Sequence, residues 1–265
     1  MISPLASIHP TAKIGSNVTI EPFAMIHDNV VIGDDSHIMS NAVIMPHSRI
    51  GVGCQIFPGA VIGGVPQDLK FVGEETTAEI GDYTTIRECV TVNRGTKDKF
   101  KTKVGKHCLL MAYAHVAHDC ILGDHVILAN AVQLAGHVEV GDYAIIGGLA
   151  GAHQFTRIGA HTYIAGHTVI RKDVPPYIKA AREPMSYAGL NIVGLQRRAF
   201  SQEKIDTISQ IYHLLFVGNH SMSSAIERIK AEVPDGEVKD EILQFVQSSK
   251  TGVIKRYAKD GMDEY

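Results

Sequence analysis

Apolar residues recur along most of this chain at a spacing of six. Isoleucine fills every sixth position in residues 8–62, and a small or β-branched residue occupies the position four residues after each of the first nine. The spacing resumes in residues 80–92 and, after a second interruption, in residues 104–170. A helix needs apolar positions at a period of 3.6 and a single strand at a period of two, so neither explains the pattern. A fixed longer period indicates stacked structural units.

The repeat predicts a mainly β fold, a parallel β-helix. Each group of six residues forms one short strand and a corner, and three groups close a triangular coil of 18 residues. The Gly, Asn and Asp between the apolar positions suit corners with unusual backbone angles. Cys54, Cys108 and Cys120 fall on small inward positions and, with Cys89, form no CxxC pair, so we predict free thiols that are mostly buried.

Two interruptions of the repeat predict loops that project from the prism, at residues 63–79 and 93–103. Loops on a rigid scaffold are where binding residues tend to lie. The repeat ends at Ile170, and we expect the prolines in residues 173–176 to block further regular strands.

The remaining sequence has helix-like apolar spacing, with Ser201 and Ser221 as expected N-caps. The helical stretches are predicted near residues 187–198, 201–217, 222–233 and 237–249. We therefore predict two domains, the β-helix over residues 1–173 and a C-terminal helical domain over residues 174–265.

Composition narrows the function classes. With 25 Lys+Arg against 28 Asp+Glu and no basic block, the chain lacks the electrostatic signature of a protein that binds nucleic acid. No 18-residue apolar stretch predicts an integral membrane segment, and the N-terminal residues do not resemble a secretory signal. We expect a cytoplasmic protein.

Histidines gather at two corners once the chain is read in coils of 18 residues. His118, His137 and His153 fall on neighbouring coils at nearly the same corner. His107, His125 and His161 form a second column, which we interpret as solvated or interface side chains. In the first group Asp119 follows His118, and a carboxylate that holds an imidazole tautomer is typical of a general base.

Three stacked histidines also fit a zinc ion with an open position for water. The γ-class carbonic anhydrases place zinc on the same β-helix, so a zinc hydratase stays open as an alternative, as does a non-catalytic scaffold. The hydration of carbon dioxide does not require the long first loop or the helical domain. Both features therefore favour an enzyme other than a zinc hydratase.

Several ordered segments resemble the UDP-N-acetylglucosamine O-acyltransferases among the hexapeptide-repeat acyltransferases. The resemblance runs from the first repeat into the C-terminal helices, and it supplies the left hand of the β-helix. The matching segments are Gln67–Lys70, Ala114–Cys120, Leu134–His137, His153–Phe155, Asp173–Tyr177 and Gly194–Arg198.

The resemblance implies that a 3-hydroxyacyl chain passes from acyl carrier protein to the 3-OH of the glucosamine of UDP-GlcNAc, the first step of lipid A synthesis. It implies no metal or other cofactor beyond the carrier thioester, and a homotrimer with active sites between chains. Whether the acceptor carries a 3-hydroxyl or a 3-amino group stays open.

Site residues follow from the same resemblance. His118 matches the general base, Asp119 lies beside it, and the N–H of Gly136 matches the donor to the oxyanion. The substrate-binding positions are Gln67, Asp68, Leu69, Lys70, His115, His137, His153, Gln154, Asn191, Arg197 and Arg198. Gly166 matches the position that measures acyl length, where glycine leaves an apolar groove open for a chain of about fourteen carbons or more. Val193 replaces an acidic residue of the family pattern. The order of the tail Lys259–Tyr265 stays open.

Overall fold

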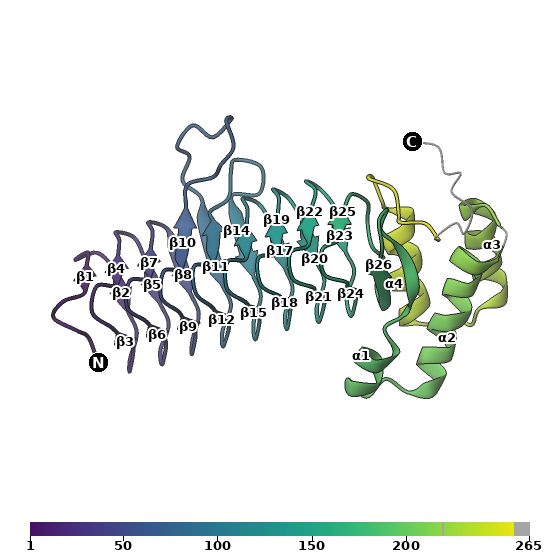
Figure 1. The fold of residues 1–265 in the computed structure, drawn as a ribbon, viewed down its shortest axis with the longest axis horizontal. Helices are drawn as coiled ribbons and strands as arrows, with labels where there is room; N and C mark the ends of the chain where they lie inside the picture. Colours follow the sequence, from purple (N-terminus) through teal and green to yellow (C-terminus); the bar gives the residue numbers. More distant parts are fainter. Residues whose placement is uncertain (219, 257–265) are drawn as a thin grey trace.

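The computed structural model describes residues 1–218 and 220–256 and shows a long triangular prism followed by a helical region (Figure 1). Three sheets of short parallel strands form its faces, and each strand of the prism pairs with the strand one coil further on. Ser7 of β1 pairs with Met25 of β4, a step of 18 residues, so the predicted coil is confirmed.

The three sheets run along the prism, and the sheet numbers used below follow the order in which the chain enters them. Sheet 1 contains β1 (Ser7–Ile8), β4 (Met25–Ile26), β7 (Val43–Ile44), β10 (Val61–Gly64), β13 (Thr91–Asn93), β16 (His115–Val116), β19 (Gln133–Leu134), β22 (Gly151–Ala152) and β25 (Val169–Ile170). Sheet 2 contains β2 (Lys13–Ile14), β5 (Val31–Ile32), β8 (Ser48–Ile50), β11 (Thr77–Ile80), β14 (Lys101–Val104), β17 (Ile121–Leu122), β20 (Glu139–Val140) and β23 (Arg157–Ile158). Sheet 3 contains β3 (Thr19–Ile20), β6 (His37–Ile38), β9 (Gln55–Ile56), β12 (Thr85–Ile86), β15 (Leu109–Leu110), β18 (Ile127–Leu128), β21 (Ile145–Ile146), β24 (Tyr163–Ile164), β26 (Ile178–Ala181) and β27 (Ser186–Leu190).

The repeated apolar side chains fill the interior of the prism. From Ile20 to Ile170 the large residue of each repeat is buried, and the small positions between them are buried as well. Cys54, Cys108 and Cys120 are among these buried positions, whereas Cys89 lies half-buried at a corner. Burial of each large side chain contributes about 1.5–3 kcal/mol, so the repeated apolar positions stabilise the prism along its length.

Both predicted loops project from the corner between sheets 1 and 2, one coil apart (Figure 1). They are shorter than expected, because the flanking strands extend into them. The first loop is residues 65–76, between β10 and β11, and the second is residues 94–100, between β13 and β14.

Strand pairing continues past the predicted end of the β-helix. β26 pairs with β24 in parallel, and β27 returns antiparallel to β26. The expectation that residues 173–176 end the strands was therefore wrong, as was the predicted helix over the first part of residues 187–198. The prolines precede β26 rather than interrupt it.

The helical region follows the last strand. It consists of α1 (Ile192–Arg197), α2 (Gln202–Tyr212) with its π-helical extension η1 (His213–Val217), α3 (Met222–Glu232) and α4 (Glu237–Gln247). Ser201 and Ser221 cap α2 and α3 as predicted, since each hydroxyl accepts a backbone N–H of the first turn.

Buried polar contacts fasten this region to the last coils. The Asp173 carboxylate, 1% exposed, accepts hydrogen bonds from the Arg157 side chain and the Thr251 hydroxyl. The Tyr177 hydroxyl donates to Glu241 of α4, and the Tyr212 hydroxyl to the carbonyl of Pro176.

Among the described residues, no helix has the length and the apolar character that a membrane span requires. Lys259–Tyr265 lie outside the described residues.

Candidate active site

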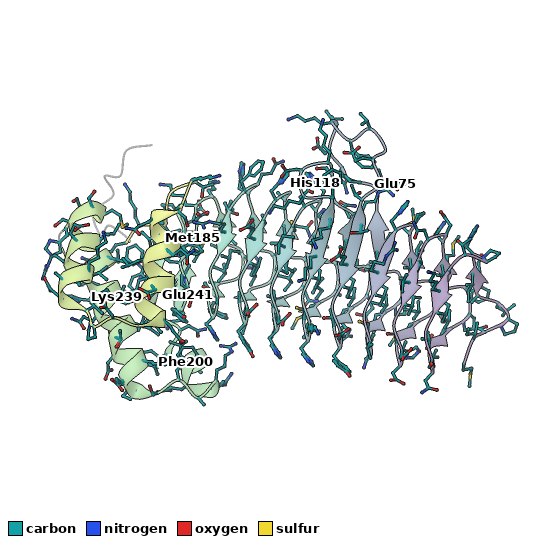
Figure 2. The ribbon with its side chains drawn as sticks, turned by 180° about the vertical axis from the view of Figure 1, so that it is seen from behind. Glu75, His118, Met185, Phe200, Lys239 and Glu241 are labelled. Atoms are coloured by element: carbon teal, nitrogen blue, oxygen red, sulfur yellow. The ribbon has the colours of Figure 1, made fainter. Side chains whose placement is uncertain are left out.

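A buried His–Asp pair occupies the corner between sheets 1 and 2, one coil beyond the second loop (Figure 2). His118 Nδ1 lies 2.8 Å from Asp119 Oδ2, and the two residues are 6% and 0% exposed. Because Nδ1 faces a carboxylate, it carries the proton, and Nε2 keeps the lone pair. The pair is therefore arranged as a base whose tautomer is fixed.

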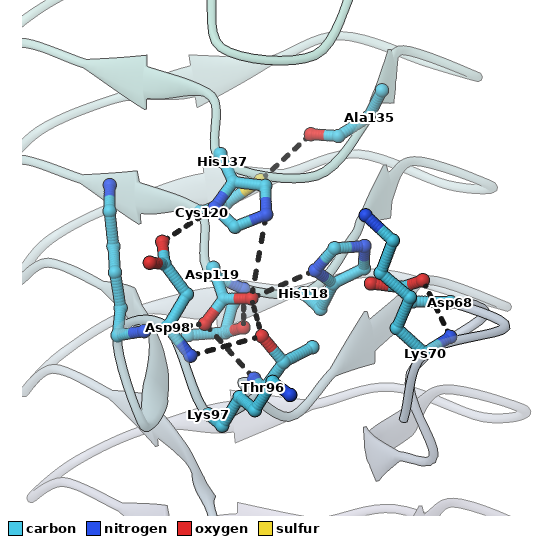
Figure 3. A network of polar contacts seen from close by, with 12 residues as sticks. Asp68, Lys70, Thr96, Lys97, Asp98, His118, Asp119, Cys120, Ala135 and His137 are labelled. Atoms are coloured by element: carbon cyan, nitrogen blue, oxygen red, sulfur yellow. Dashed lines mark hydrogen bonds and ion pairs between the residues drawn. The ribbon is translucent and has the colours of Figure 1, made fainter. Parts of the chain in front are cut away.

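The second loop holds the Asp119 carboxylate in place (Figure 3). The Thr96 hydroxyl donates to Oδ2 at 2.7 Å, and the backbone N–H groups of Thr96 and Lys99 donate to Oδ1 at 3.0 and 3.2 Å. Burial by itself would raise the pKa of Asp119, but the hydrogen bonds from Thr96, His118 and Lys99 outweigh it and hold the pKa below its usual value. Asp119 therefore stays charged beside the imidazole at neutral pH.

Gly136 lies against the His118 ring. A Cβ at this position would lie 2.5 Å from Cε1 and 2.6 Å from Nε2 of His118, so only glycine leaves room for the imidazole. The Gly136 N–H donates to no other group among the described residues, whereas the Gly136 carbonyl accepts from Phe155 at 3.3 Å. A free donor thus lies next to the basic nitrogen.

Two more histidines border the pair. The rings of His118 and His137 meet edge to face at 5.1 Å between centroids, and His115 Nδ1 lies 2.7 Å from the Thr91 hydroxyl. Burial, followed by the neighbouring His118, lowers the pKa of His115. Burial also lowers the pKa of His137, although Asp119 opposes it. Both rings are therefore uncharged near pH 7.

The other predicted residues at this corner are exposed, except for Asp68. His153 and Gln154 lie one coil beyond His137, and Phe155 beside them stacks on the His137 ring at 4.4 Å. In the first loop Gln67, Leu69 and Lys70 are exposed and Asp68 is half-buried. Figure 3 shows Asp68 and Lys70 on the other side of the His118 ring from Asp119. Polar side chains at the surface therefore border the buried base.

The remaining predicted residues lie at the other two corners of the prism. Gly166 follows β24 between sheets 3 and 1, where a Cβ would lie 2.9 Å from the carbonyl oxygen of Gly148. Asn191, Arg197 and Arg198 belong to α1 and its caps, which lie over the corner between sheets 2 and 3. One chain does not bring these residues to His118.

Two of them are already engaged within their own chain. The Asn191 amide accepts the Gly194 N–H and donates to the His161 carbonyl. Arg198 donates to the carbonyls of Gly194 and Tyr143, and its guanidinium lies 5.1 Å over the Tyr143 ring. Arg197 and Val193 are exposed.

The second histidine column is a continuous stack of rings at the corner between sheets 2 and 3. Neighbouring rings lie 4.5–5.6 Å apart in the order Tyr83, His107, His125, Tyr143, His161 and Tyr177. His161 is half-buried and meets the Phe200 ring edge to face at 4.9 Å, and burial, with the charge of Arg198, lowers its pKa to about 4. His107 is exposed, as expected.

Three groups of the site could converge on a metal. One ligand atom each from His118, Asp119 and His137 lies within 4.8 Å of the others. However, the His118 Nδ1 and Asp119 Oδ2 atoms are already hydrogen-bonded to one another, which suits a base more than a ligand set.

Comparisons with known proteins bear on the family and the fold. Residues 173–254 match the model of domain 2 of UDP N-acetylglucosamine O-acyltransferase, and residues 29–64 and 101–136 match the bacterial transferase hexapeptide model. The acyl-[acyl-carrier-protein]–UDP-N-acetylglucosamine O-acyltransferase of Thiobacillus denitrificans is 41% identical over 202 residues, which are 76% of this chain and 78% of that protein. The chain belongs to the UDP-N-acetylglucosamine O-acyltransferase family.

Solved structures of this acyltransferase family have the same fold along nearly the whole chain. A UDP-N-acetylglucosamine acyltransferase from Bacteroides fragilis superposes with a TM-score of 0.94 at 51% identity and covers 96% of this chain and 100% of its own. The Acinetobacter baumannii structure gives a TM-score of 0.92 at 41% identity and covers 96% and 99%. The predicted enzyme class, an O-acyltransferase, is confirmed.

Proposed function

We propose that this chain transfers a 3-hydroxyacyl group from acyl carrier protein to the glucosamine 3-OH of UDP-GlcNAc, which begins lipid A synthesis. The observation that carries the proposal is the buried His118–Asp119 pair with the unpaired N–H of Gly136 beside it. An alcohol loses its proton only as it attacks, so the reaction needs a base and an oxyanion donor at one place.

The proposed reaction balances without a covalent enzyme intermediate. His118 Nε2 takes the proton of the sugar hydroxyl while the hydroxyl oxygen attacks the thioester carbon. The tetrahedral oxyanion accepts the Gly136 N–H, a type of contact worth about 10²–10³ in rate. The C–S bond then breaks, and the carrier thiolate takes the proton back from His118. Asp119 stabilises the imidazolium between the two steps.

The acceptor is proposed to lie against the polar side chains that border the base. Gln67, Asp68, Leu69 and Lys70 approach it from the first loop. His115, His137, His153 and Gln154 lie on the coils beside the base and offer polar side chains to the hydroxyls of the sugar. The imidazoles of His115 and His137 do so in the uncharged form.

We further propose a homotrimer in which neighbouring prisms complete each site. From corners that face a neighbouring chain, Asn191, Arg197 and Arg198 contact the nucleotide, and Gly166 leaves the end of the acyl groove open for a longer chain. Arg197 is exposed and free to contact a phosphate, whereas Arg198 acts mainly by holding α1. Val193 leaves the nucleotide one polar contact fewer than the family pattern. The cytoplasmic location stays a prediction.

The test is mass spectrometry of the products after EDTA-treated protein has been incubated with UDP-GlcNAc and carrier proteins bearing 3-hydroxyacyl chains of several lengths. An acylated nucleotide sugar supports the reaction and reads the preferred length, and a 3-amino analogue tests the acceptor. His118→Ala is expected to abolish turnover while the trimer persists in sedimentation. Unchanged turnover in this variant would refute the mechanism. No product with any donor, together with stoichiometric zinc in the untreated protein, would favour the hydratase alternative.

A further inference from the structure

The second loop reaches the catalytic pair through one side chain that sequence reasoning did not single out. Thr96 is 5% exposed, and it contacts both oxygens of the Asp119 carboxylate, the hydroxyl with Oδ2 at 2.7 Å and the backbone N–H with Oδ1 at 3.0 Å. The loop thus folds back over the coil that carries His118, 22 positions further along the chain. No spacing rule links the two.

The atom that Thr96 holds is the atom that fixes the base. Asp119 Oδ2 accepts from the Thr96 hydroxyl at 2.7 Å and lies 2.8 Å from His118 Nδ1. A carboxylate rotates freely about its last bond, so one oxygen stays in front of an imidazole only while other donors hold the group. Here the hydroxyl fixes Oδ2, and the N–H groups of Thr96 and Lys99 fix Oδ1.

We propose that Thr96 is a positioning residue for catalysis, whose hydroxyl holds the Asp119 carboxylate in the orientation that fixes His118 as the base. The inference rests on the proposed function and assigns a role within it. Thr96 touches neither substrate in this role. It acts through Asp119, and therefore through the tautomer and the direction of the His118 lone pair.

The loop is itself anchored on the first loop. The Glu74 carboxylate accepts the backbone N–H of Lys97 at 3.0 Å, next to Thr96. The Arg94 guanidinium lies 5.2 Å from the centre of the Phe71 ring. The segment that presents Asp68 and Lys70 to the acceptor is thus connected to the segment that orients the base.

The experiment compares Thr96→Val, which keeps the shape and removes the hydroxyl, with Thr96→Ser, which keeps the hydroxyl. Thr76→Val is the matched control, because the buried Thr76 hydroxyl makes no hydrogen bond among the described residues. Thermal midpoints, kcat and KM for UDP-GlcNAc, and the pH profile of kcat are measured for all four proteins.

Thr96→Val is expected to lower kcat by about tenfold or more, the loss typical of a hydrogen bond to a charged group, with little change in KM. The acid limb of the profile reports protonation of the base, and it moves to lower pH because a displaced carboxylate stabilises the imidazolium less. The other ionisable groups around the pair, His115, His137, Asp98 and Lys99, are the same in every variant. Thr96→Ser restores most of kcat, and Thr76→Val resembles the wild type.

A Thr96→Val enzyme with kcat within twofold of wild type and an unmoved acid limb would overturn the inference. So would an equal loss in Thr76→Val, or a loss explained by a lower folded fraction with the limb unmoved. A wild-type protein without turnover would refute the proposed function and this inference together, whereas an active wild type beside an unaffected Thr96→Val refutes only the inference.

Discussion

Replacing Gly136 with alanine tests the geometry of the base most directly. The added methyl carbon would lie 2.5 Å from Cε1 and 2.6 Å from Nε2 of His118. Because carbon contacts are comfortable near 3.5 Å, the imidazole must move by roughly 1 Å. On the other side of the ring, Nδ1 of His118 lies 2.8 Å from Asp119 Oδ2. The imidazole therefore cannot move away from the new methyl group and keep its hydrogen bond to Asp119.

A displacement of this size costs about 10²-fold in rate when it separates a base from the proton it abstracts. Alanine keeps the backbone N–H, so the loss would come from the displaced ring rather than from a missing oxyanion donor. The assay is kcat with saturating UDP-GlcNAc and acyl carrier protein, together with the thermal midpoint.

Gly151→Ala is the matched control on the next coil. A Cβ there meets only the carbonyl oxygen of Gln133, at 3.9 Å, so we expect its activity to be close to wild type. A Gly136→Ala enzyme that keeps more than half of the wild-type kcat would refute the idea that Nε2 of His118 works from this position.

Three further predictions concern metal, pH and stability. Dialysis against EDTA is expected to leave kcat unchanged, measured with the metal content of the same sample, and recovery only on adding zinc would contradict the assignment of a metal-free base. His161, whose pKa is lowered to about 4 by burial and Arg198, stays uncharged in the folded state. The unfolded state binds the proton first, so the free energy of unfolding decreases as pH falls from about 6.5 towards 4. His161→Phe should reduce this decrease, as measured by thermal melts at several pH values. An unchanged pH dependence in the variant would exclude His161 as the source of the decrease. Lys239→Met removes a buried ammonium that donates to the carbonyls of Lys230 and Val233. The variant should lower the free energy of unfolding, measured by urea titration, by about 2 kcal/mol. Lys230→Met, a change at an exposed lysine, should leave this free energy unchanged.

The prism was predictable because its core positions follow a short-range repeat in the sequence. Each inward position repeats every six residues regardless of what lies beyond the coil, and nearly all of these side chains are buried. The same register brought His118, His137 and His153 to one corner. Residues 187–190 were predicted as the start of a helix, whereas they belong to β27. That strand forms by pairing with β26, and no local period in the sequence indicates this contact. Thr96 escaped notice for the same reason, since its bond to Asp119 joins a loop to the next coil.

The insertions and the catalytic residues occupy one corner for a physical reason. Both loops project from the prism between a strand of sheet 1 and a strand of sheet 2. The same corner carries His118, Gly136 and His153 on the coils that follow. A corner position points away from the core, so an insertion there disturbs no inward side chain and the coil closes again in register. Val92 pairs with Ile62 across the first loop and with Val116 across the second loop. Side chains on an inserted loop then meet those of the next coil at a fixed height. In such a prism a loop can be recruited to orient a base without any change to the strands that support it, and Thr96 occupies the position where that happens.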